Sequence, residues 1–404
     1  MTSGEACDRL GVRPQTLYAY VSRGLLVPRK DGRRSQFAAS EIEALAQRTA
    51  RGRRPGRLEI HIDTDVTLID PSGRLFYRGV NVADIAGKWS YERTAEWLWN
   101  EEDRGDGRTW SPEPEVLARC RAVVDAAGPA MSVLDRLLLA TTAAAGGQSV
   151  ATREPVAEGR PGVGEHLSNG TLISTIVSAL HPRQRDAPRS IAQTLCGVVA
   201  AGSREPRLVG LVDTALVLLA DHELAASALA VRVTASTKAS PAHALAAGLS
   251  AVSGRLHGTA SDATEALFRR NEHRSEVTLE PLIAGRQEAY SSQTVGMPGV
   301  GHAVYKVDDP RATILMQAVK AALPTAKRRT VQAVIDTVRS RTSSPINVDM
   351  ALGALVYGVG LAPGAGAAIF AVARMAGWLA QYAEESNYCL RYRPRAVYTG
   401  TRPY

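Results

Sequence analysis

The sequence predicts a mostly α-helical protein built from two or three domains. Its length of 404 residues is too great for one small core. Aromatic residues make up only 5% of the chain, whereas Ala and Leu are abundant, and this composition favours packed helices over sheets. The hydrophobic and charged fractions, 45% and 22%, are ordinary for a globular protein.

Positive charge is concentrated at the start of the chain. Residues 1–57 hold 12 Arg and Lys against 5 Asp and Glu, so they carry seven of the eight net positive charges. A general polyanion binder would be basic along its whole length. The uneven distribution instead predicts a nearly neutral body behind a basic head.

Cysteine usage and the first residues of the chain predict a cytoplasmic location. The four cysteines are far apart and form no CxxC pair, which is typical of reduced thiols and gives no support for disulfides or a zinc site. The N-terminus has no apolar segment of the kind found in signal peptides, so we expect none here.

The basic head shows helix, hairpin and helix patterns in that order. Residues 3–23 contain two short helical patterns, with Pro14 in the first turn of the second. Residues 28–34 are basic and turn at Asp31-Gly32, which predicts a small hairpin. Ser40 is expected to cap a further helix.

This head, residues 1–50, resembles a MerR-type winged helix-turn-helix domain. The resemblance implies that the second helix enters the major groove of DNA and that the basic wing contacts phosphates. The residues expected to contact DNA lie on that helix and in the wing: Gln15, Thr16, Tyr18, Arg29, Lys30, Arg33 and Arg34. Because heads of this shape can also serve as docking modules, DNA binding and docking remain alternatives.

Residues 51–58 are expected to form a basic linker, followed by a small β-meander. Three stretches alternate apolar and polar residues, and a turn at 70–73 separates the last two: 59–63, 66–70 and 74–78. A helix is expected from Ile85 to Trp99. Beyond it the patterns are almost entirely helical as far as Glu385.

One stretch imitates a membrane span, because no residue from Met350 to Ala373 is charged. The turn Ala362-Pro363-Gly364 divides it into two pieces that are each too short to cross a bilayer. We therefore predict two buried helices joined by a turn, and no membrane association.

Three of the eight histidines stand in settings that suit carbonyl chemistry. His222 ends an apolar run and has an acid on either side, and His257 precedes a glycine. His302 follows the glycine-rich segment 298–301, where glycines permit close approach of the backbone to a ligand. A lone histidine is usually structural, so these three become informative only when they are taken with the charged residues below.

Asp349 and Arg374 are the charged residues that border the uncharged stretch. Asp349 follows Asn347-Val348, so it either caps a helix or, when buried against apolar residues, acts as a base with a raised pKa. Burying Arg374 is costly without an anionic partner, which could be a structural carboxylate or a carboxylate of the substrate.

The order and spacing of these segments resemble the citrate synthase family. The resemblance runs from about Glu59 to Gly400 and is strongest at Gly301-His302-Ala303-Val304-Tyr305-Lys306 and Asp309-Pro310-Arg311. It implies the citrate synthase fold, a mostly helical homodimer whose small domain (258–354) closes over substrate held by a large domain (59–257 and 355–404). It also implies condensation of acetyl-CoA with oxaloacetate, followed by hydrolysis of citryl-CoA.

The resemblance assigns a role to each candidate residue and requires neither a metal nor a cofactor. The implied catalytic residues are the base Asp349, His257 as a donor to the enolate, and His302 as the group that polarises the ketone. The implied ligands of the oxaloacetate carboxylates are His222, Arg311, Arg374 and, from the other subunit, Arg393. Those implied for CoA are Lys306, Gly299 and Gly301.

Three departures from the family pattern leave alternatives open. Arg255 stands where the family has proline, Thr259 stands where it has glycine, and Met350-Ala351-Leu352 replaces an aromatic-containing segment. One alternative is a 2-methylcitrate synthase, because the extra methylene of propionyl-CoA changes binding by only about 1–3 kcal/mol. The other alternative is a DNA-binding regulator that kept the fold to sense a metabolite.

Overall fold

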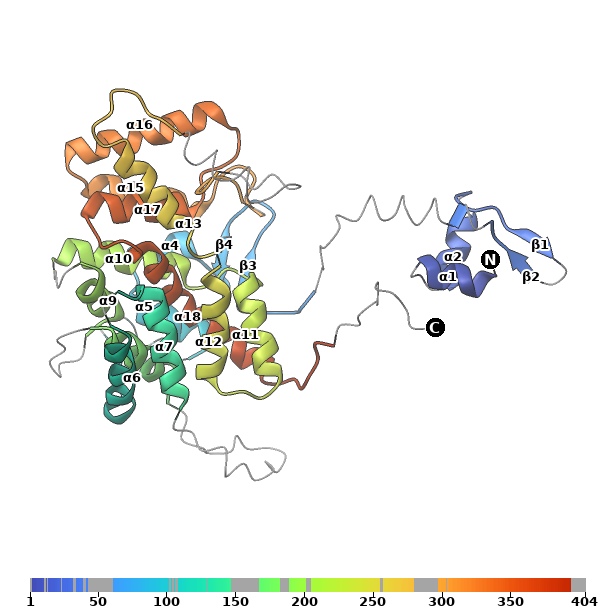
Figure 1. The fold of residues 1–404 in the computed structure, drawn as a ribbon, viewed down its shortest axis with the longest axis horizontal. Helices are drawn as coiled ribbons and strands as arrows, with labels where there is room; N and C mark the ends of the chain where they lie inside the picture. Colours follow the sequence, from blue (N-terminus) through green and yellow to red (C-terminus); the bar gives the residue numbers. More distant parts are fainter. Residues whose placement is uncertain are drawn as a thin grey trace. The chain divides into compact units, whose positions relative to one another are not determined.

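The structure is a computed structural model, and the chain divides into two compact units, Met1–Asp63 and Thr64–Tyr404 (Figure 1). We call the first unit the head and the second the body. The structure describes residues 2–10, 12, 14–22, 24–31, 34–38, 41–42, 61–101, 103, 105, 108–128, 130–146, 167–181, 189–200, 205–254, 257–279, 297–302 and 304–393.

The head contains the predicted helix pair and hairpin. Its elements are α1 (Ser3–Leu10), α2 (Pro14–Ser22), β1 (Arg29–Asp31) and the antiparallel β2 (Arg34–Gln36). Apolar side chains from the two helices and from the described residues that follow them form a core of their own: Ala6, Cys7, Leu17, Leu26, Phe37 and Ile42. Most of the helix expected after Ser40 lies outside the described residues.

The body begins with a small antiparallel sheet in the order β3 (Thr67–Ile69), β4 (Leu75–Tyr77) and β5 (Val80–Asn81). The meander was predicted correctly, but one of its strands was not. Residues 61–63 are not a strand, and the third strand is β5. The reason is a tight turn at Arg78-Gly79, where both residues have positive φ, 43° and 81°, so the chain reverses at once and pairs again with β4.

The prediction of a single helix from Ile85 to Trp99 was wrong, because the structure has two helices in this region. α4 (Val82–Ile85) ends before Gly87, whose φ of 73° does not continue a helix. α5 (Tyr91–Leu98) then starts at a new cap, where the Ser90 side chain accepts a hydrogen bond from the N–H of Arg93.

The rest of the body is helical, as the composition predicted. Many helices start at a Ser or Asn cap or with proline in the first turn, because these residues satisfy or remove the free N–H groups there. The helices are α6 (Pro114–Ala127), α7 (Val133–Ala145), α8 (Asn169–Ala179), α9 (Ile191–Val199), α10 (Pro206–Leu219), α11 (Ala226–Ser236), α12 (Pro241–Val252), α13 (Ala260–Arg270), α15 (Pro310–Ala322), α16 (Thr325–Arg341), α17 (Val348–Val359) and α18 (Ala365–Glu385).

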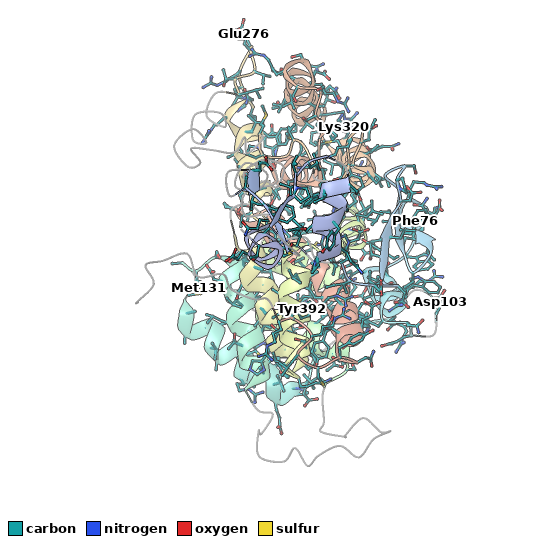
Figure 2. The ribbon with its side chains drawn as sticks, turned by 90° about the vertical axis from the view of Figure 1, so that its right-hand side faces the viewer. Phe76, Asp103, Met131, Glu276, Lys320 and Tyr392 are labelled. Carbon is teal, nitrogen blue, oxygen red and sulfur yellow. The ribbon has the colours of Figure 1, made fainter. Side chains whose placement is uncertain are left out.

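Helix α18 is the axis of the body, because every residue from Ala365 to Gln381 is buried. Helices α5, α7, α8, α10, α11 and α12 pack around it. Helices α13, α15, α16 and α17 pack against one another and lie at the top of the body in the views of Figures 1 and 2. Position 354, a predicted domain boundary, lies inside α17, and the division into large and small domains stays a prediction.

The uncharged stretch forms two buried helices, as predicted. α17 ends at Val359, before Gly360, and α18 begins after Gly364. Both glycines have positive φ, 72° and 79°. Within the described ranges, no helix has both the length and the apolar character that crossing a membrane requires.

Candidate active site

A cavity of about 430 Å³ in the body brings together most of the residues predicted to act on substrate. Its walls come from the turn before α11, the segment before α13, the loop before α15, and the helices α15, α17 and α18. The predicted residues that line it are His222, His257, Gly301, His302, Arg311, Asp349 and Arg374. Segments more than a hundred residues apart in the sequence therefore form one site.

His222 is held at a rigid corner just after α10. The Tyr77 hydroxyl accepts a hydrogen bond from the N–H of Asp221 at 3.2 Å, which fixes the backbone next to this histidine. His222 Nε2 lies 3.1 Å from the hydroxyl of Tyr305. Burial, followed by the charges of Arg311 and Arg374, lowers the pKa of His222 well below its ordinary value. The imidazole is therefore neutral at physiological pH.

The proton position on His302 is determined by the backbone. Its Nδ1 accepts hydrogen bonds from the N–H groups of Val304 at 3.0 Å and Tyr305 at 3.3 Å. Burial and the charge of Arg311 lower its pKa to about 4, so the ring is neutral and carries its single proton on Nε2. Arg311 Nη2 lies 3.5 Å from this Nε2. Both nitrogens are donors, so a ligand oxygen between them could accept from both.

Two buried guanidinium groups give the cavity its affinity for anions. Arg311 is 3% exposed and is held by Asp309, which accepts from Nε at 3.0 Å and from Nη2 at 2.8 Å. Arg374 is 1% exposed, donates from Nε to the Leu219 carbonyl at 2.9 Å, and lies over the Phe370 ring. No carboxylate of a described residue is within ion-pair distance of Arg374. The carboxylate of Asp221 acts on this guanidinium from beyond ion-pair distance, and a carboxylate of a ligand would supply a direct partner.

Asp349 is not the cap of α17, so one of the two roles that the sequence left open is excluded. The cap is Asn347, whose side chain accepts from the N–H of Asp349 at 3.0 Å. Asp349 Oδ1 is buried and has no hydrogen-bond partner among the described residues. Burial is the main cause that raises the pKa of Asp349 to about 7. A carboxyl group with this pKa can act as a general base near neutral pH.

His257 faces the same cavity and has a partner of its own. Its Nε2 lies 2.8 Å from the hydroxyl of Ser227, and its ring meets that of Phe370 edge to face. Burial, together with the charge of Arg374, lowers the pKa of His257 to about 4. If Ser227 donates to Nε2, the single proton of the neutral ring is on Nδ1 and is available to a ligand.

Five residues that support this site were not predicted from the sequence: Ser227, Tyr305, Asp309, Asn347 and Phe370. All five lie within five residues of a predicted site residue. The fifth, Phe370, is four residues before Arg374 and so lies on the same face of α18. Helical spacing was the one signal in the sequence that could have indicated it.

Three other predicted residues do not line the cavity: Gly299, Lys306 and Arg393. Gly299 is buried and shapes the loop, because a Cβ there would lie 2.7 Å from the Thr264 Cγ2. Lys306 is exposed and donates to the carbonyl of His302 at 3.2 Å. Arg393 is exposed. Their roles toward CoA and a second subunit stay predictions.

The predicted DNA contacts are only partly described. On α2, Gln15 and Tyr18 are exposed and Thr16 is half-buried. The side chains of the four basic residues of the wing lie outside the described set: Arg29, Lys30, Arg33 and Arg34. The same holds for Arg255, the main departure from the family pattern, whereas Thr259 is half-buried just before α13.

Curated relatives of this chain are citrate synthases. Citrate synthase 2 of Bacillus subtilis (strain 168) is 32% identical over 233 residues, which are 56% of this chain and 61% of the relative. The citrate synthase of Acidithiobacillus ferridurans is 30% identical over 207 residues, 48% of this chain and 52% of the relative. These matches span about half to three-fifths of the relatives. The citrate synthase of Saccharolobus solfataricus is 28% identical over 371 residues, 83% of this chain and 93% of the relative.

Solved structures with the same fold include two citrate synthases. That of Thermotoga maritima MSB8 has a TM-score of 0.62 and 22% identity, and the match covers 85% of this chain and 94% of that one. That of Thermoplasma acidophilum, a ternary complex with carboxymethyl coenzyme A and oxaloacetate, has a TM-score of 0.62 and 22% identity over 88% of this chain and 97% of that one. At this identity the likeness shows the fold alone.

Family comparison covers almost the whole chain. Residues 1–50 match a family described as a helix-turn-helix domain. Residues 59–395 match the family described as the C-terminal domain of citrate synthase, which is far more than half of the chain. The protein therefore belongs to the citrate synthase family and carries a helix-turn-helix domain at its N-terminus.

Proposed function

We propose that this protein condenses acetyl-CoA with oxaloacetate to give citrate and CoA. The observation that carries the proposal is the environment of Asp349, a half-buried residue whose Oδ1 is buried and has no hydrogen-bond partner in the part of the chain that the structure describes. It lies in one cavity with three neutral histidines and two guanidinium groups. A base of this kind is needed to remove a proton from the weakly acidic methyl group of a thioester. The ligands named for the Thermoplasma acidophilum structure, a coenzyme A analogue and oxaloacetate, support the same pair of substrates.

Oxaloacetate fits the polar side of the cavity. Arg311 and Arg374 would bind its carboxylates, and His222 would donate or accept a hydrogen bond beside them. His302 would direct its Nε2–H to the ketone oxygen, because its Nδ1 is already bound to the backbone. A homodimer in which Arg393 of each chain reaches the other chain's cavity would complete the binding of the dicarboxylate.

The acyl donor would react at the opposite side of the cavity. Asp349 takes a proton from the methyl carbon, and His257 donates a hydrogen bond to the enolate oxygen that forms. The methyl carbon then bonds to the ketone carbon, and the ketone oxygen takes the proton from Nε2 of His302. The proton that Asp349 removed from the methyl group is returned to His302 through solvent, so both groups end in their starting states. Water finally cleaves the thioester and releases CoA, and closure of the site would delay this step until condensation is complete.

Release of free thiol from acetyl-CoA and from propionyl-CoA, each with oxaloacetate, tests the proposal. We expect release with acetyl-CoA to exceed that with propionyl-CoA and to collapse in Asp349→Ala. The matched control is Asp125→Ala, which changes an exposed acid on α6, a helix that does not line the cavity. Faster turnover of propionyl-CoA would assign the protein as a 2-methylcitrate synthase. Absence of thiol release with both donors would refute the enzyme.

The helix-turn-helix match supports a second candidate, a DNA-binding regulator that senses a metabolite through its body. Exposure of Gln15 and Tyr18 on α2 leaves them free to contact a base edge. The test is binding of the full chain to its own promoter at several salt concentrations, with and without oxaloacetate. Equal and weak affinity for all duplexes would reject this candidate.

A further inference from the structure

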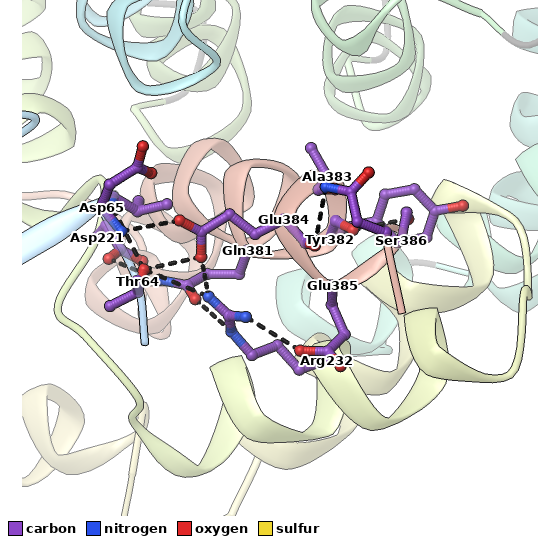
Figure 3. Close-up of polar contacts among 12 residues, drawn as sticks. Thr64, Asp65, Asp221, Arg232, Gln381, Tyr382, Ala383, Glu384, Glu385 and Ser386 are labelled. Carbon is purple, nitrogen blue, oxygen red and sulfur yellow. Dashed lines mark hydrogen bonds and ion pairs between the residues drawn. The ribbon is translucent and has the colours of Figure 1, made fainter. Parts of the chain in front are cut away.

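A buried polar cluster lies beside the cavity and is not used by the proposed chemistry. At its centre is Arg232 of α11, which is fully buried. We call this arginine and its partners the Arg232 cluster (Figure 3): Arg232, Gln381, Glu384, Glu385 and Thr64. The guanidinium donates to Gln381 Oε1 at 2.6 Å and to Glu385 Oε2 at 3.0 Å, and it also pairs with Glu384.

The cluster orients one side chain toward the cavity. Because Arg232 can only donate, it fixes the oxygen of the Gln381 amide on its own side. The amide nitrogen of Gln381 must then face the other way, and it donates to Asp221 Oδ2 at 3.3 Å. Asp221 is the residue directly before His222. The chain of contacts therefore runs from α11 through α18 to the corner that holds the histidine.

The corner rests directly on α18, so its place depends on that helix. The N–H of Gly377 donates to the Ala220 carbonyl at 2.9 Å. A Cβ at Gly377 would lie 2.2 Å from Asp221 Oδ1, so no gap separates the corner from the helix. Gln381 is one helical turn further along the same face. A change in its bond to Asp221 is therefore transmitted to the neighbouring histidine rather than absorbed.

Stability alone does not account for a buried ionic cluster, because well-packed apolar residues are often as stable or more stable. Its directional bonds instead select one arrangement of the groups they join. We propose that Gln381, oriented by Arg232, is a positioning residue that sets the place of His222 in the cavity. This inference rests on the proposed function, in which His222 binds a 2-oxo dicarboxylate.

The test compares Gln381→Glu with a rescue and a control. Gln381→Glu still accepts from Arg232 but no longer donates to Asp221, and it places two carboxyl groups against each other. The double variant Asp221→Asn/Gln381→Glu restores a donor and keeps the total charge, because the amide and the carboxylate exchange places. The control is Glu384→Gln, which alters the cluster at Arg232, Thr64 and Asp65 but leaves in place both groups that bond to the Gln381 amide, Arg232 Nε and Asp221 Oδ2.

Titration calorimetry on the full chain measures the affinities for oxaloacetate and, separately, for CoA. We expect Gln381→Glu to bind oxaloacetate about tenfold more weakly, which corresponds to about 1.4 kcal/mol, with little change for CoA. The double variant should recover most of this loss, because the two changes are coupled. Glu384→Gln should bind both ligands as the wild type does.

Three results would overturn the inference: unchanged oxaloacetate affinity in Gln381→Glu, no recovery in the double variant, or a parallel loss of both ligands in Glu384→Gln. If Gln381→Glu does not fold, the double variant decides, since it must fold and bind oxaloacetate nearly as the wild type does. A wild-type protein that binds oxaloacetate but releases no thiol refutes the proposed enzyme and leaves this inference standing. A wild-type protein that does not bind oxaloacetate overturns the inference.

Discussion

Replacing Asp349 by Asn is expected to abolish thiol release and, at the same time, to stabilise the fold. Asparagine has nearly the same shape as aspartate, so the packing of α17 should persist. Burial raises the pKa of Asp349 from 3.8 to about 7, so the native protein holds this proton more tightly than the unfolded chain does. Above pH 7 the native state must bury a charge that the unfolded chain exposes to water. The variant does not carry this cost.

The size of the effect follows from the shift in pKa. One pKa unit corresponds to about 1.4 kcal/mol, so ionised Asp349 lowers the free energy of unfolding by at most about 4 kcal/mol. Below the unfolded pKa both states are protonated and the effect is absent. Between the two pKa values the wild type loses stability as pH rises, because the unfolded state binds fewer protons than the native state. Above the folded pKa the loss is constant.

Urea unfolding of the wild type and Asp349→Asn at a series of pH values measures this difference. We expect equal stability near pH 4 and a variant that is more stable by a few kcal/mol at pH 8, with the change spread over the interval between. A difference that does not vary with pH would refute the reasoning. So would a variant that is less stable than the wild type at pH 8.

Three further changes test other parts of the structure. Gly299 and Gly301 both have positive φ, but only a Cβ at Gly299 would be crowded. In urea unfolding, Gly299→Ala should therefore lose about 1–3 kcal/mol more of the free energy of unfolding than Gly301→Ala. Equal losses would contradict the loop geometry. A hydrogen bond from the Ser72 hydroxyl is the first cause that lowers the pKa of Asp70 to about 2. Asp70→Asn should therefore have a lower melting temperature than the wild type at pH 7, and the two melting temperatures should be equal near pH 2. A difference that is present near pH 2 and absent at pH 7 would be inconsistent with that bond. Asp309→Asn leaves the buried guanidinium of Arg311 without its carboxylate. The variant should lose about 3–5 kcal/mol of the free energy of unfolding and bind oxaloacetate more weakly. Unchanged affinity would show that this pair does not shape the site.

The sequence was sufficient to predict the helical body and to identify the residues whose chemistry is unusual in their surroundings. Arg374 could be identified because a charge after a long uncharged stretch requires a partner, and the two buried helices followed from one proline–glycine turn. The strands of the small sheet were harder to predict. A strand of two residues such as β5 depends on the tight turn at Arg78-Gly79, and alternation of apolar and polar residues extends beyond the residues that actually pair.

The supporting residues of the site could not be predicted because their importance comes from contacts across the fold. Ser227 is one serine among many until α11 places its hydroxyl 2.8 Å from His257. Tyr305 bonds to His222, which is 83 residues away in the sequence, and no local pattern encodes that meeting. The tautomer of His302 depends on two backbone N–H groups, so it follows from the course of the loop and not from residue type.

The unpaired charge of Arg374 links substrate binding to the strength of the base. This guanidinium lowers the pKa of His222, His257 and Asp349 in the empty cavity. A carboxylate bound to Arg374 would offset that charge, so all three pKa values must rise when a dicarboxylate enters. Asp349 then becomes a stronger base, while the histidines, whose pKa values start far below neutral, remain uncharged donors. In the proposed reaction the bound dicarboxylate therefore strengthens the base that acts on the acyl-CoA, as long as the pH exceeds the raised pKa and Asp349 keeps its charge.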